Sequence, residues 1–244
     1  MQTAVVTGGA QGLGAVIARA LVAEGYRVVI ADVNNEAASV LVQELGAERC
    51  SALSLDVSSE HAVENALDTI ETQWGMPYLW VNNAAIMKAQ SVLDIDVQTF
   101  DRVMAVNLRG TFLCSQRFAR RLLAAKNKGR IVNIGSLAGQ NGGAATGAHY
   151  AASKGGIHTL TKVFARDLAR YGITVNTIAP GPLDLPSVVA TIGEDKLPGL
   201  LANLPTGQLG NPNTVARMVV ELAREDANGL TGATIDINSG LYLR

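Results

Sequence analysis

The chain has 244 residues, of which 48% are hydrophobic and 17% are charged, and its formal net charge is −1. A chain of this length and apolar content can build one large buried core, so we expect a single globular domain. The balanced charge argues against a nucleic-acid-binding surface, which needs a strong basic field, and no stretch reaches the ~18 consecutive apolar residues of a membrane span.

Short runs rich in apolar and β-branched residues alternate along the chain with longer stretches of helical spacing. In chain order, we expect strands at residues 3–7, 27–31, 52–55, 78–81, 130–134, 174–178 and 233–237. The helical stretches between them cover residues 12–24, 35–46, 59–74, 97–125, 150–171 and 214–225. Such alternation predicts parallel βαβ units, and the near-continuous apolar runs indicate strands covered by helices on both faces. We therefore predict an α/β fold over residues 1–244, a single Rossmann-like, doubly wound domain with a seven-stranded parallel sheet.

The turn after the first predicted strand is rich in glycine. Gly8, Gly12 and Gly14 follow residues 3–7 and open the first predicted helix. Glycines at such a position permit a tight turn and let a pyrophosphate approach the positive end of the helix. We expect this turn to bind a dinucleotide, with contacts from Gly8, Gln11, Gly12, Leu13 and Gly14.

An acidic residue, Asp32, stands 18 residues past Gly14 at the tip of the second predicted strand. A carboxylate there can accept both hydroxyls of the adenosine ribose and would repel a 2′-phosphate. The following residues, Val33 and Asn34, are not basic, so we expect NAD(H) as the cofactor rather than NADP(H). The alternative is a solvated acid that caps the following helix.

Two further strand ends belong to the same predicted edge of the sheet. Asp56 and Val57 end the third strand, where a carboxylate can meet the adenine amino group and an apolar side chain can cover the ring. Asn83 belongs to Asn-Asn-Ala-Ala at the end of the fourth, where small residues allow backbone contact with the cofactor. Ordinary turn chemistry at strand ends is the alternative for both segments.

Tyr150 and Lys154 lie four residues apart in the helix predicted at residues 150–171, so their side chains share one face. A cation held close to a phenol stabilises the phenolate, and such a pair can exchange a proton nearer to neutral pH. The spacing alone is common on helix surfaces. His149 could act as a second base, but we interpret it as a rim or packing residue, and we expect His61 and His158 on helix surfaces.

Residues 180–205 break the alternation, because Pro182, Pro186 and Pro198 interrupt a largely apolar segment. The pattern predicts a short helical flap at about residues 182–207 that closes over an apolar substrate. A plain surface excursion between a strand and the last helix is the alternative.

The two cysteines, Cys50 and Cys114, are far apart and lack neighbouring His or Cys residues that would complete a metal set. We interpret them as packing residues and expect no metal. Few thiols and a start without a signal-peptide pattern predict a reducing, cytoplasmic location.

Taken together, these segments resemble the short-chain dehydrogenase/reductase family over essentially the whole chain. The resemblance rests on TGGAQGLG from Thr7, NNAA from Asn82, VNLRG around Asn107, IVNIGS ending at Ser136, YAASK from Tyr150, and Pro180-Gly181. Within the family the chain is most similar to bacterial 3-oxoacyl-[acyl-carrier-protein] reductases, through YAASKGGIHTLTK, GITVNTIAPG, LPTGQLGNP and TGATIDINSGLYLR.

The resemblance implies a role for each of four residues. Tyr150 is the acid/base that gives a proton to the carbonyl oxygen in reduction or takes the hydroxyl proton in oxidation. Lys154 lowers the pKa of Tyr150 and binds the nicotinamide ribose. Ser136 hydrogen-bonds the substrate oxygen, and Asn107 holds a water that joins Lys154 to solvent. Preorganised donors of this kind stabilise charge that develops on oxygen during hydride transfer.

The chain departs from the family pattern at three places. Ala85 stands where the family usually has Gly and adds a methyl group near the cofactor. Ser136 and Tyr150 are fourteen residues apart, one more than usual, which predicts a one-residue insertion within residues 142–148. After Pro180 and Gly181, which we expect to contact the cofactor, the family often has a Thr. Here we expect backbone groups around Leu183 to bind the nicotinamide amide, and the hydroxyl contact is missing unless Ser187 reaches it.

We conclude that the sequence predicts an NAD(H)-dependent oxidoreductase that interconverts a secondary alcohol and a ketone, with a 3-oxoacyl thioester as one candidate substrate. An oxidation-directed dehydrogenase of a sugar alcohol, cyclic alcohol or steroid-like ligand is an alternative, and a nucleotide-sensing regulatory protein without turnover is another. The expected partners are a small molecule and like subunits, with no nucleic acid or membrane. Family members commonly form tetramers, which here would use residues 97–125, 150–171 and 240–244, although the apolar tail at residues 241–243 could also pack on its own domain.

Overall fold

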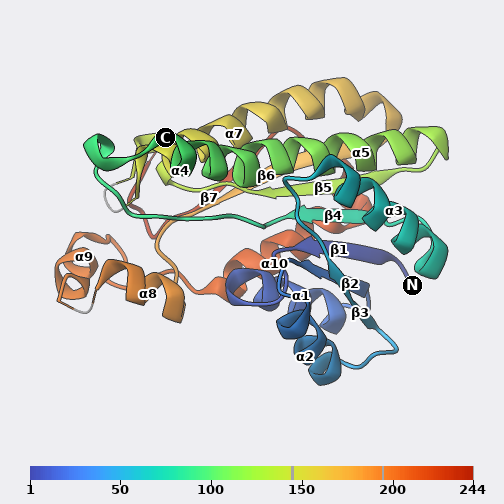
Figure 1. The fold of residues 1–244 in the computed structure, drawn as a ribbon, viewed down its shortest axis with the longest axis horizontal. Helices are drawn as coiled ribbons and strands as arrows, with labels where there is room; N and C mark the ends of the chain where they lie inside the picture. Colours follow the sequence, from blue (N-terminus) through green and yellow to red (C-terminus); the bar gives the residue numbers. More distant parts are fainter. Residues whose placement is uncertain (144–145, 194, 244) are drawn as a thin grey trace.

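The computed structural model describes residues 1–143, 146–193 and 195–243 (Figure 1). All seven strands form one parallel sheet in the order β3-β2-β1-β4-β5-β6-β7. The predicted fold class is confirmed, and so are the strand positions within a few residues. The strands are β1 (Thr3–Thr7), β2 (Arg27–Asp32), β3 (Cys50–Ser54), β4 (Leu79–Asn82), β5 (Gly129–Ile134), β6 (Ile173–Pro180) and β7 (Thr234–Ile237).

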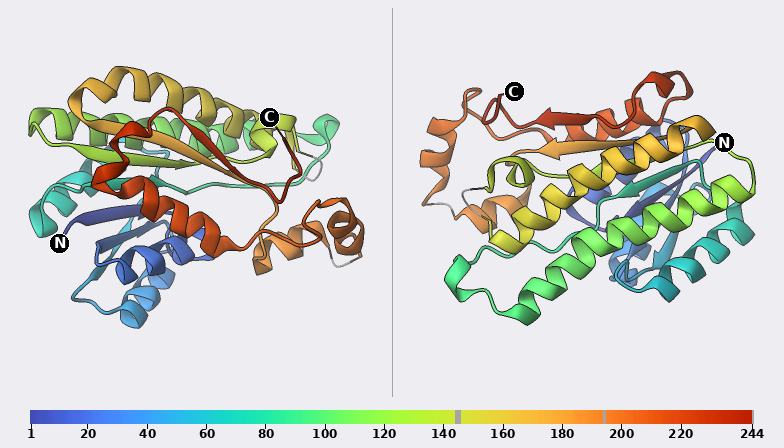
Figure 2. Two further views of the ribbon diagram at one scale, coloured as in Figure 1. Left: turned by 180° about the vertical axis from the view of Figure 1, so that it is seen from behind. Right: turned by 90° about the horizontal axis from the view of Figure 1, so that it is seen from above.

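Helices cover both faces of the sheet, as Figures 1 and 2 show. One face carries α1 (Gly12–Ala23), α2 (Asn35–Leu45) and α10 (Pro212–Ala223). The other carries α3 (Glu60–Trp74), α4 (Val97–Met104), α5 (Gly110–Ala124) and α7 (Ala148–Leu168). The short helices are α6 (Ala138–Asn141), α8 (Pro186–Ile192) and α9 (Leu197–Asn203), with 3₁₀ turns at Val92–Asp94, Ala169–Tyr171 and Glu225–Gly229.

The core lies in two layers because strand side chains alternate between the two faces of the sheet. On β1, Ala4 and Val6 point into the layer under α1 and α10, whereas Val5 points into the layer under α3 and α5. Trp80 of β4 is fully buried in the second layer, where its ring lies 5.5 Å from that of Phe118. This two-sided burial explains why the strands read as near-continuous apolar runs.

The helix predicted at residues 97–125 is interrupted. Between α4 and α5 the chain forms a π-helical turn, η2 (Ala105–Arg109), that carries Asn107. The helix predicted at residues 150–171 begins two residues earlier, at Ala148, and ends in the 3₁₀ turn Ala169–Tyr171. Single-turn π-bulges inside α-helices are rare and occur frequently at functional sites.

The starts of the helices differ in how they are capped. Asn34, Ser59, Asp96 and Asn211 each accept a hydrogen bond from the first turn of the helix that follows, which is the usual N-cap arrangement. The N-cap residues of α1 and α7 make no side-chain cap hydrogen bond. Both of these uncapped ends lie at the carboxyl edge of the sheet.

The segment at residues 182–207 contains α8 and α9, which stand beside the main body at the carboxyl edge (Figure 1). Its expected closure over substrate stays a prediction.

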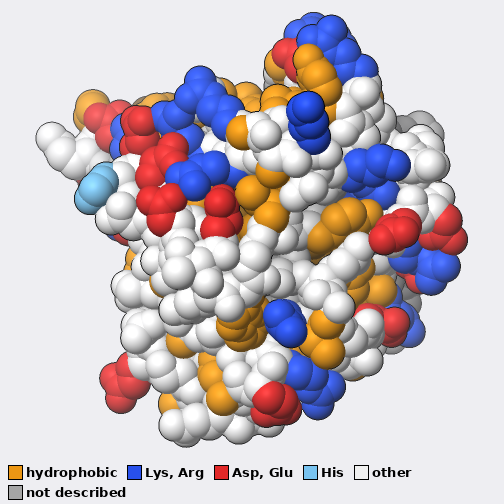
Figure 3. Space-filling view, turned by 90° about the vertical axis from the view of Figure 1, so that its right-hand side faces the viewer, with side chains coloured by type: hydrophobic (Ala, Val, Ile, Leu, Met, Phe, Trp, Pro, Cys, Tyr) orange, Lys and Arg blue, Asp and Glu red, His pale blue; other side chains and the backbone are white. Residues whose placement is uncertain are grey.

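The rest of the surface carries both acidic and basic side chains. The face in Figure 3 interleaves acidic and basic side chains. Arg121 on α5 forms ion pairs with Glu64 and Asp68 on α3. None of the described helices combines the length and apolar character that crossing a membrane requires.

Candidate active site

The residues predicted for cofactor and substrate gather at the carboxyl edge of the sheet. The strand order reverses between β1 and β4, and the glycine-rich turn follows β1 while Asn83 follows β4. In a doubly wound sheet this switch point is where a ligand binds. Ser136 follows β5 by two residues, and Pro180 ends β6.

The glycine-rich turn is built so closely that side chains do not fit. Gly8 has φ +60° and Gly12 has φ +54°, which are left-handed conformations that favour glycine. A Cβ at Gly8 would lie 2.7 Å from Cα of Ala84, and one at Gly14 would overlap the carbonyl oxygen of Gly8. The turn therefore offers main-chain surface where a phosphate could approach.

The first turn of α1 leaves its N–H groups available to an anion. Gln11 is the exposed N-cap residue and makes no side-chain cap, and no acidic residue stands in the first turn. The N–H groups of Gly12, Leu13 and Gly14 belong to the unpaired donors at a helix start, where the helix dipole also favours negative charge. The chemistry of this end fits a pyrophosphate.

The turn is tied to the end of β4 through Thr7 and Asn83. The Thr7 hydroxyl donates to the carbonyl of Val81 at 3.2 Å and accepts from the N–H groups of Asn83 and Ala84, both at 3.1 Å. Nδ2 of Asn83 donates to the carbonyls of Thr7 and Gly8 at 3.0 and 2.9 Å. This holding role of Asn83 was not predicted, and its backbone contact with a cofactor stays a prediction.

Asp32 faces the glycine-rich turn. The residue is 7% exposed, and its carboxylate accepts from the N–H groups of Ala10 at 3.1 Å and Asn34 at 3.0 Å. The alternative in which Asp32 caps the next helix is wrong, because the N-cap of α2 is Asn34, whose side chain accepts from Ala37. Asp32 is therefore placed beside the glycine-rich turn, where it could meet the adenosine ribose of a dinucleotide whose pyrophosphate lies at that turn.

Asp56 and Val57 stand together past the end of β3. The Asp56 carboxylate accepts from the hydroxyl and N–H of Ser58 at 2.6 and 2.9 Å. These hydrogen bonds, with the guanidinium of Arg102 3.9 Å away, lower the pKa of Asp56. Val57 is buried against Gly110, where a Cβ would lie 2.7 Å from Cγ2 of Val57. Arg102 was missed because nothing local in the sequence relates it to Asp56.

Tyr150, Ser136 and Lys154 meet between α7 and the end of β5. The Ser136 side chain lies near enough to the Tyr150 hydroxyl to lower its pKa, and Oγ of Ser136 accepts from the N–H of Ala138 at 3.1 Å. Nζ of Lys154 lies 5.6 Å from the centroid of the Tyr150 ring and donates to the carbonyl of Ile134 at 2.7 Å. The predicted phenol and ammonium thus share one side of α7, with Ser136 facing the phenol.

The pKa shifts in this cluster differ from the expectation. Burial raises the pKa of Tyr150, and the hydrogen bond with Ser136 opposes that rise only in part. Burial also lowers the pKa of Lys154 to about 8. The expected lowering of the Tyr150 pKa by Lys154 is therefore not seen in the protein alone. Desolvation dominates both groups, and the Lys154 nitrogen is engaged with the Ile134 carbonyl.

Asn107 is fully buried in the π-helical turn. Its Oδ1 accepts from the N–H of Ile86 at 2.8 Å, while Nδ2 donates to the carbonyl of Ile86 at 2.9 Å and to the hydroxyl of Ser153 at 3.1 Å. The side chain thus clamps the segment that follows β4 onto α7. A water held between Asn107 and Lys154 stays a prediction.

Two histidine assignments need correction. His158 does not lie on the surface: it is 8% exposed, with Nε2 3.1 Å from the carbonyl oxygen of Ser136. Gly135 makes room for it, because a Cβ there would lie 2.8 Å from Cε1 of His158. His149 is a packing residue but not a rim residue, since it is fully buried and its Nδ1 accepts the N–H of Tyr150 at 2.9 Å. His61 is exposed, as predicted.

The segment after β6 is only partly suited to its expected role. Gly181 packs against β7's end, where a Cβ would lie 2.8 Å from Cα of Asn238. The side chain of Leu183 is buried in the core layer under α1, so only its backbone remains for a cofactor contact. Ser187 is exposed on α8, and Ala85 is exposed after β4. The insertion predicted within residues 142–148 includes residues 144–145, which lie outside the described residues.

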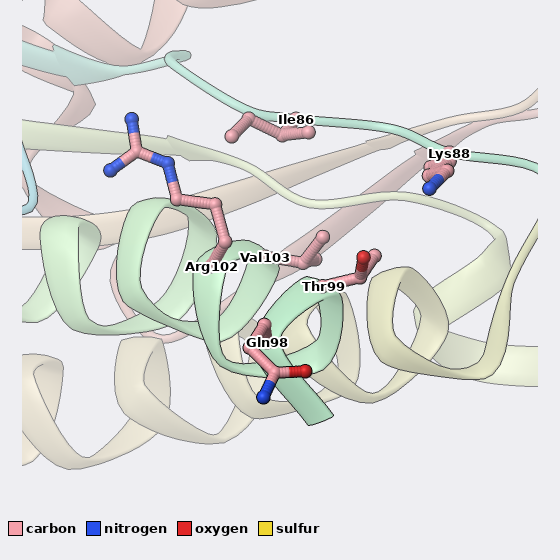
Figure 4. Close-up of a pocket in the computed structure, with 6 residues that line it drawn as sticks. All are labelled: Ile86, Lys88, Gln98, Thr99, Arg102 and Val103. Carbon is pink, nitrogen blue, oxygen red and sulfur yellow. The ribbon is translucent and has the colours of Figure 1, made fainter. Parts of the chain in front are cut away.

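A cavity of about 330 Å³ adjoins the segment after β4 (Figure 4). It lies between that segment and α4. Arg102 lines the cavity and also lies 3.9 Å from the Asp56 carboxylate. Its lining consists of Ile86, Lys88, Gln98, Thr99, Arg102 and Val103. Within the described ranges, no group of three or more His, Cys, Asp or Glu side chains is arranged to hold a metal, and both Cys50 and Cys114 are buried free thiols.

Known proteins match this chain along its whole length. A family model described as enoyl-(acyl carrier protein) reductase matches residues 8–242. Sorbitol dehydrogenase of Cereibacter sphaeroides is 33% identical over 99% of this chain and 98% of its own length. The 3-oxoacyl-[acyl-carrier-protein] reductase of Escherichia coli is 34% identical, covering 98% and 97%. The (3R)-3-hydroxyacyl-CoA dehydrogenase of Mus musculus is also 34% identical, covering 98% and 96%.

Proposed function

The chain belongs to the short-chain dehydrogenase/reductase family, and on that premise we propose that it is an NAD(H)-dependent oxidoreductase interconverting a secondary alcohol and a ketone. One observation carries the proposal: the side chain of Ser136 lies near enough to the Tyr150 hydroxyl to affect its pKa, and both stand beside the buried Lys154 at the carboxyl edge of the sheet. Two hydroxyls so placed can hold one substrate oxygen between them.

The proposed mechanism assigns one task to each side chain. Bound nicotinamide supplies or accepts the hydride. Ser136 donates a hydrogen bond to the substrate oxygen, and Tyr150 gives its proton to that oxygen in reduction or takes it back in oxidation. Because burial raises the pKa of Tyr150, the phenol is protonated at neutral pH, which suits the reductive direction. Lys154, with a pKa of about 8, can follow a charge change on Tyr150 by taking or releasing a proton.

NAD(H) is the cofactor that the residues fit best. The uncapped start of α1 and the glycine-rich turn suit the pyrophosphate. Asp32 stands beside that turn as an acceptor for ribose hydroxyls, and a 2′-phosphate would meet its negative charge. Asp56 and Val57 would contact the adenine. The other expected cofactor contacts come from Asn83 and from the backbone near Pro180, Gly181 and Leu183. Asn107 would hold a water next to Lys154.

Two substrate classes are supported by relatives. The Escherichia coli and Mus musculus proteins are named for 3-oxoacyl and 3-hydroxyacyl thioesters, and the Cereibacter sphaeroides protein is named for sorbitol. A β-oxoacyl thioester and a sugar alcohol are therefore the first candidates, with closure of the flap at residues 182–207 selecting between them. A nucleotide-sensing protein without turnover is the competing function, and the assembled hydroxyl pair argues against it.

The test is a screen followed by one substitution. Acetoacetyl-coenzyme A, cyclohexanone and fructose are offered with NADH or NADPH, and sorbitol with NAD⁺, while absorbance at the nicotinamide band is followed. Replacing Tyr150 with Phe removes the acid/base and should lower kcat at least about a hundredfold, while cofactor affinity stays the same. An unchanged kcat in Tyr150→Phe would refute the acid/base assignment, and cofactor binding without turnover of any probe would favour the sensor.

We also propose a homotetramer in a reducing, cytoplasmic location. A groove of about 910 Å³ lies along the outer faces of α4, α5 and α7, the helices expected to meet a second subunit, and Leu243 near the chain end is 84% exposed. Light scattering should give a mass near four times 25.5 kDa, and a monomer would contradict this assembly. The two buried free thiols support the location.

A further inference from the structure

The first turn of α7 lacks the usual cap. Its N-cap residue is Gly147, which has no side chain to accept a hydrogen bond from the first turn. The N–H of Tyr150, at the third helical position, would therefore be without a partner. His149 provides one from inside the helix, because its Nδ1 accepts from the Tyr150 N–H at 2.9 Å.

Gly147 and the ring of His149 fit each other. A Cβ at Gly147 would overlap Cε1 of His149 and lie 2.7 Å from its Nδ1 and 2.9 Å from the carbonyl oxygen of Lys88. The N–H of Gly147 donates to that same carbonyl at 3.2 Å. The residues that usually cap helices, Ser, Thr, Asn and Asp, cannot stand at this position while the ring is in place.

Burying the imidazole of His149 costs free energy, because one of its nitrogens has no hydrogen-bond partner in the described part of the chain, and packing alone does not explain why a histidine stands here. Nδ1 accepts a hydrogen bond, so the neutral ring holds its proton on Nε2. Nε2 is buried without a hydrogen-bond partner among the described residues. An unpaired buried donor is destabilising, and a Leu or Phe would fill the space without it. The acceptor on the opposite nitrogen is therefore the property that distinguishes His149 from an apolar residue.

The carbonyl of Tyr150 is held from the other side. The hydroxyl of Ser153 donates to it at 2.7 Å and accepts from Nδ2 of Asn107 at 3.1 Å. Ser153 and Asn107 are both fully buried. Asn107 is itself fixed by its two hydrogen bonds to the backbone of Ile86, so Ser153 connects Tyr150 to the segment that follows β4.

We propose that His149 and Ser153 are positioning residues, which hold the main chain of Tyr150 by its amide and its carbonyl and so fix its hydroxyl opposite Ser136. The inference rests on the acid/base role proposed for Tyr150. Neither side chain needs to touch substrate. Both act through the first turn of α7, where a small displacement of the backbone moves the phenol away from a reacting oxygen.

The kinetic test compares variants that keep or remove the acceptor. His149→Leu removes it at similar size, and His149→Asn restores it with a shorter side chain. With acetoacetyl-coenzyme A and NADH, or sorbitol and NAD⁺, His149→Leu should lower kcat about tenfold while KM for the cofactor changes less than about twofold. His149→Asn should recover most of the loss, and Ser153→Ala should lower kcat about fivefold.

Thr161→Val is the matched control. Thr161 lies farther along α7, is fully buried, and its hydroxyl bonds to the carbonyl of Ile157 and to the side chains of Asn133 and Thr177. Its loss should lower thermal stability and leave kcat unchanged. An unchanged kcat in His149→Leu, a failure of Asn to restore it, or an equal loss in Thr161→Val would overturn the proposal.

Amide hydrogen exchange tests the positioning role of His149 without requiring enzymatic turnover. The peptide spanning residues 147–155 should exchange about tenfold faster in His149→Leu than in the wild type, and at the wild-type rate in His149→Asn. Unchanged exchange in His149→Leu would refute the cap. If the wild type turns over no probe, the proposed function fails while this measurement still tests how the Tyr150 backbone is held.

Discussion

Replacing Asn107 with Leu tests how the π-helical turn holds the segment after β4. The two side chains are similar in volume, so the substitution removes hydrogen bonds without opening a large cavity. The N–H and carbonyl of Ile86 lose their partners, which lie at 2.8 and 2.9 Å, and the hydroxyl of Ser153 loses a donor but keeps its bond to Tyr150. The main loss is therefore confined to one backbone residue.

The magnitude follows from the two orphaned groups. A buried polar group left unpaired costs roughly 1–3 kcal/mol, and because Ile86 is only half-buried we take the lower part of that range for each group. The sum is about 2–3 kcal/mol of unfolding free energy. For a chain of this size, that loss corresponds to a Tm lower by about 4–12 °C.

Scanning calorimetry at one fixed protein concentration measures this difference. Asn65→Leu is the control, because Asn65 is an exposed amide on α3 whose side chain bonds the neighbouring His61 side chain, and its replacement should shift Tm by less than about 2 °C. If Asn107→Leu melts within the range of Asn65→Leu, the amide does not clamp the segment after β4 and the reasoning is wrong.

Three further predictions concern the site. Burial lowers the pKa of Lys154 from 10.5 to about 8, so between pH 8 and 10 the unfolded chain binds more protons at this group than the folded chain does, and the stability of the protein should rise with pH. Curves of Tm against pH for the wild type and Lys154→Met that run parallel from pH 7 to 10 would contradict this. Asp32→Ala removes the charge that faces a 2′-phosphate, so the preference for NADH over NADPH should fall at least about tenfold in fluorescence titrations, and an unchanged ratio would exclude Asp32 as its source. Gly14→Ala places a methyl group against the carbonyl of Gly8 and should weaken NADH binding at least about tenfold. The control Gly199→Ala on α9, where a Cβ meets nothing within 4 Å, should leave NADH binding unchanged, and equal affinities of the two variants would show that the turn tolerates a side chain.

Much of the fold was predictable because its signals are local. The strand of residues 3–7 is an apolar run covered on both faces, and the glycines that follow it mark a turn whatever the rest of the chain does. Tyr150 and Lys154 are related by helix geometry alone. Resemblance to a family extended these local signals to Ser136 and Asn107, whose placement in the cluster depends on other elements.

The less predictable features depend on contacts between distant parts of the chain. The helix at residues 97–125 contains a π-helical turn whose Asn107 binds Ile86 and Ser153, and no periodicity of apolar residues encodes those partners. His158 has the spacing of a surface residue, but it packs against Gly135 and the Ser136 carbonyl after β5. The sequence pattern assigns a helix face, whereas only the packed sheet decides what covers that face.

The sequence by itself determined the succession of strands and helices along the chain, the glycine-rich turn and the shared helix face of Tyr150 and Lys154, because each depends on neighbours within a few residues. The tertiary structure alone decided the electrostatic state of the site. Burial, not the nearby charge, sets the direction of the pKa shifts of Tyr150 and Lys154, and burial is created by elements that come together only in the folded chain. The same folding brings Asn107 to Ser153 and so connects the segment after β4 to the turn that carries Tyr150.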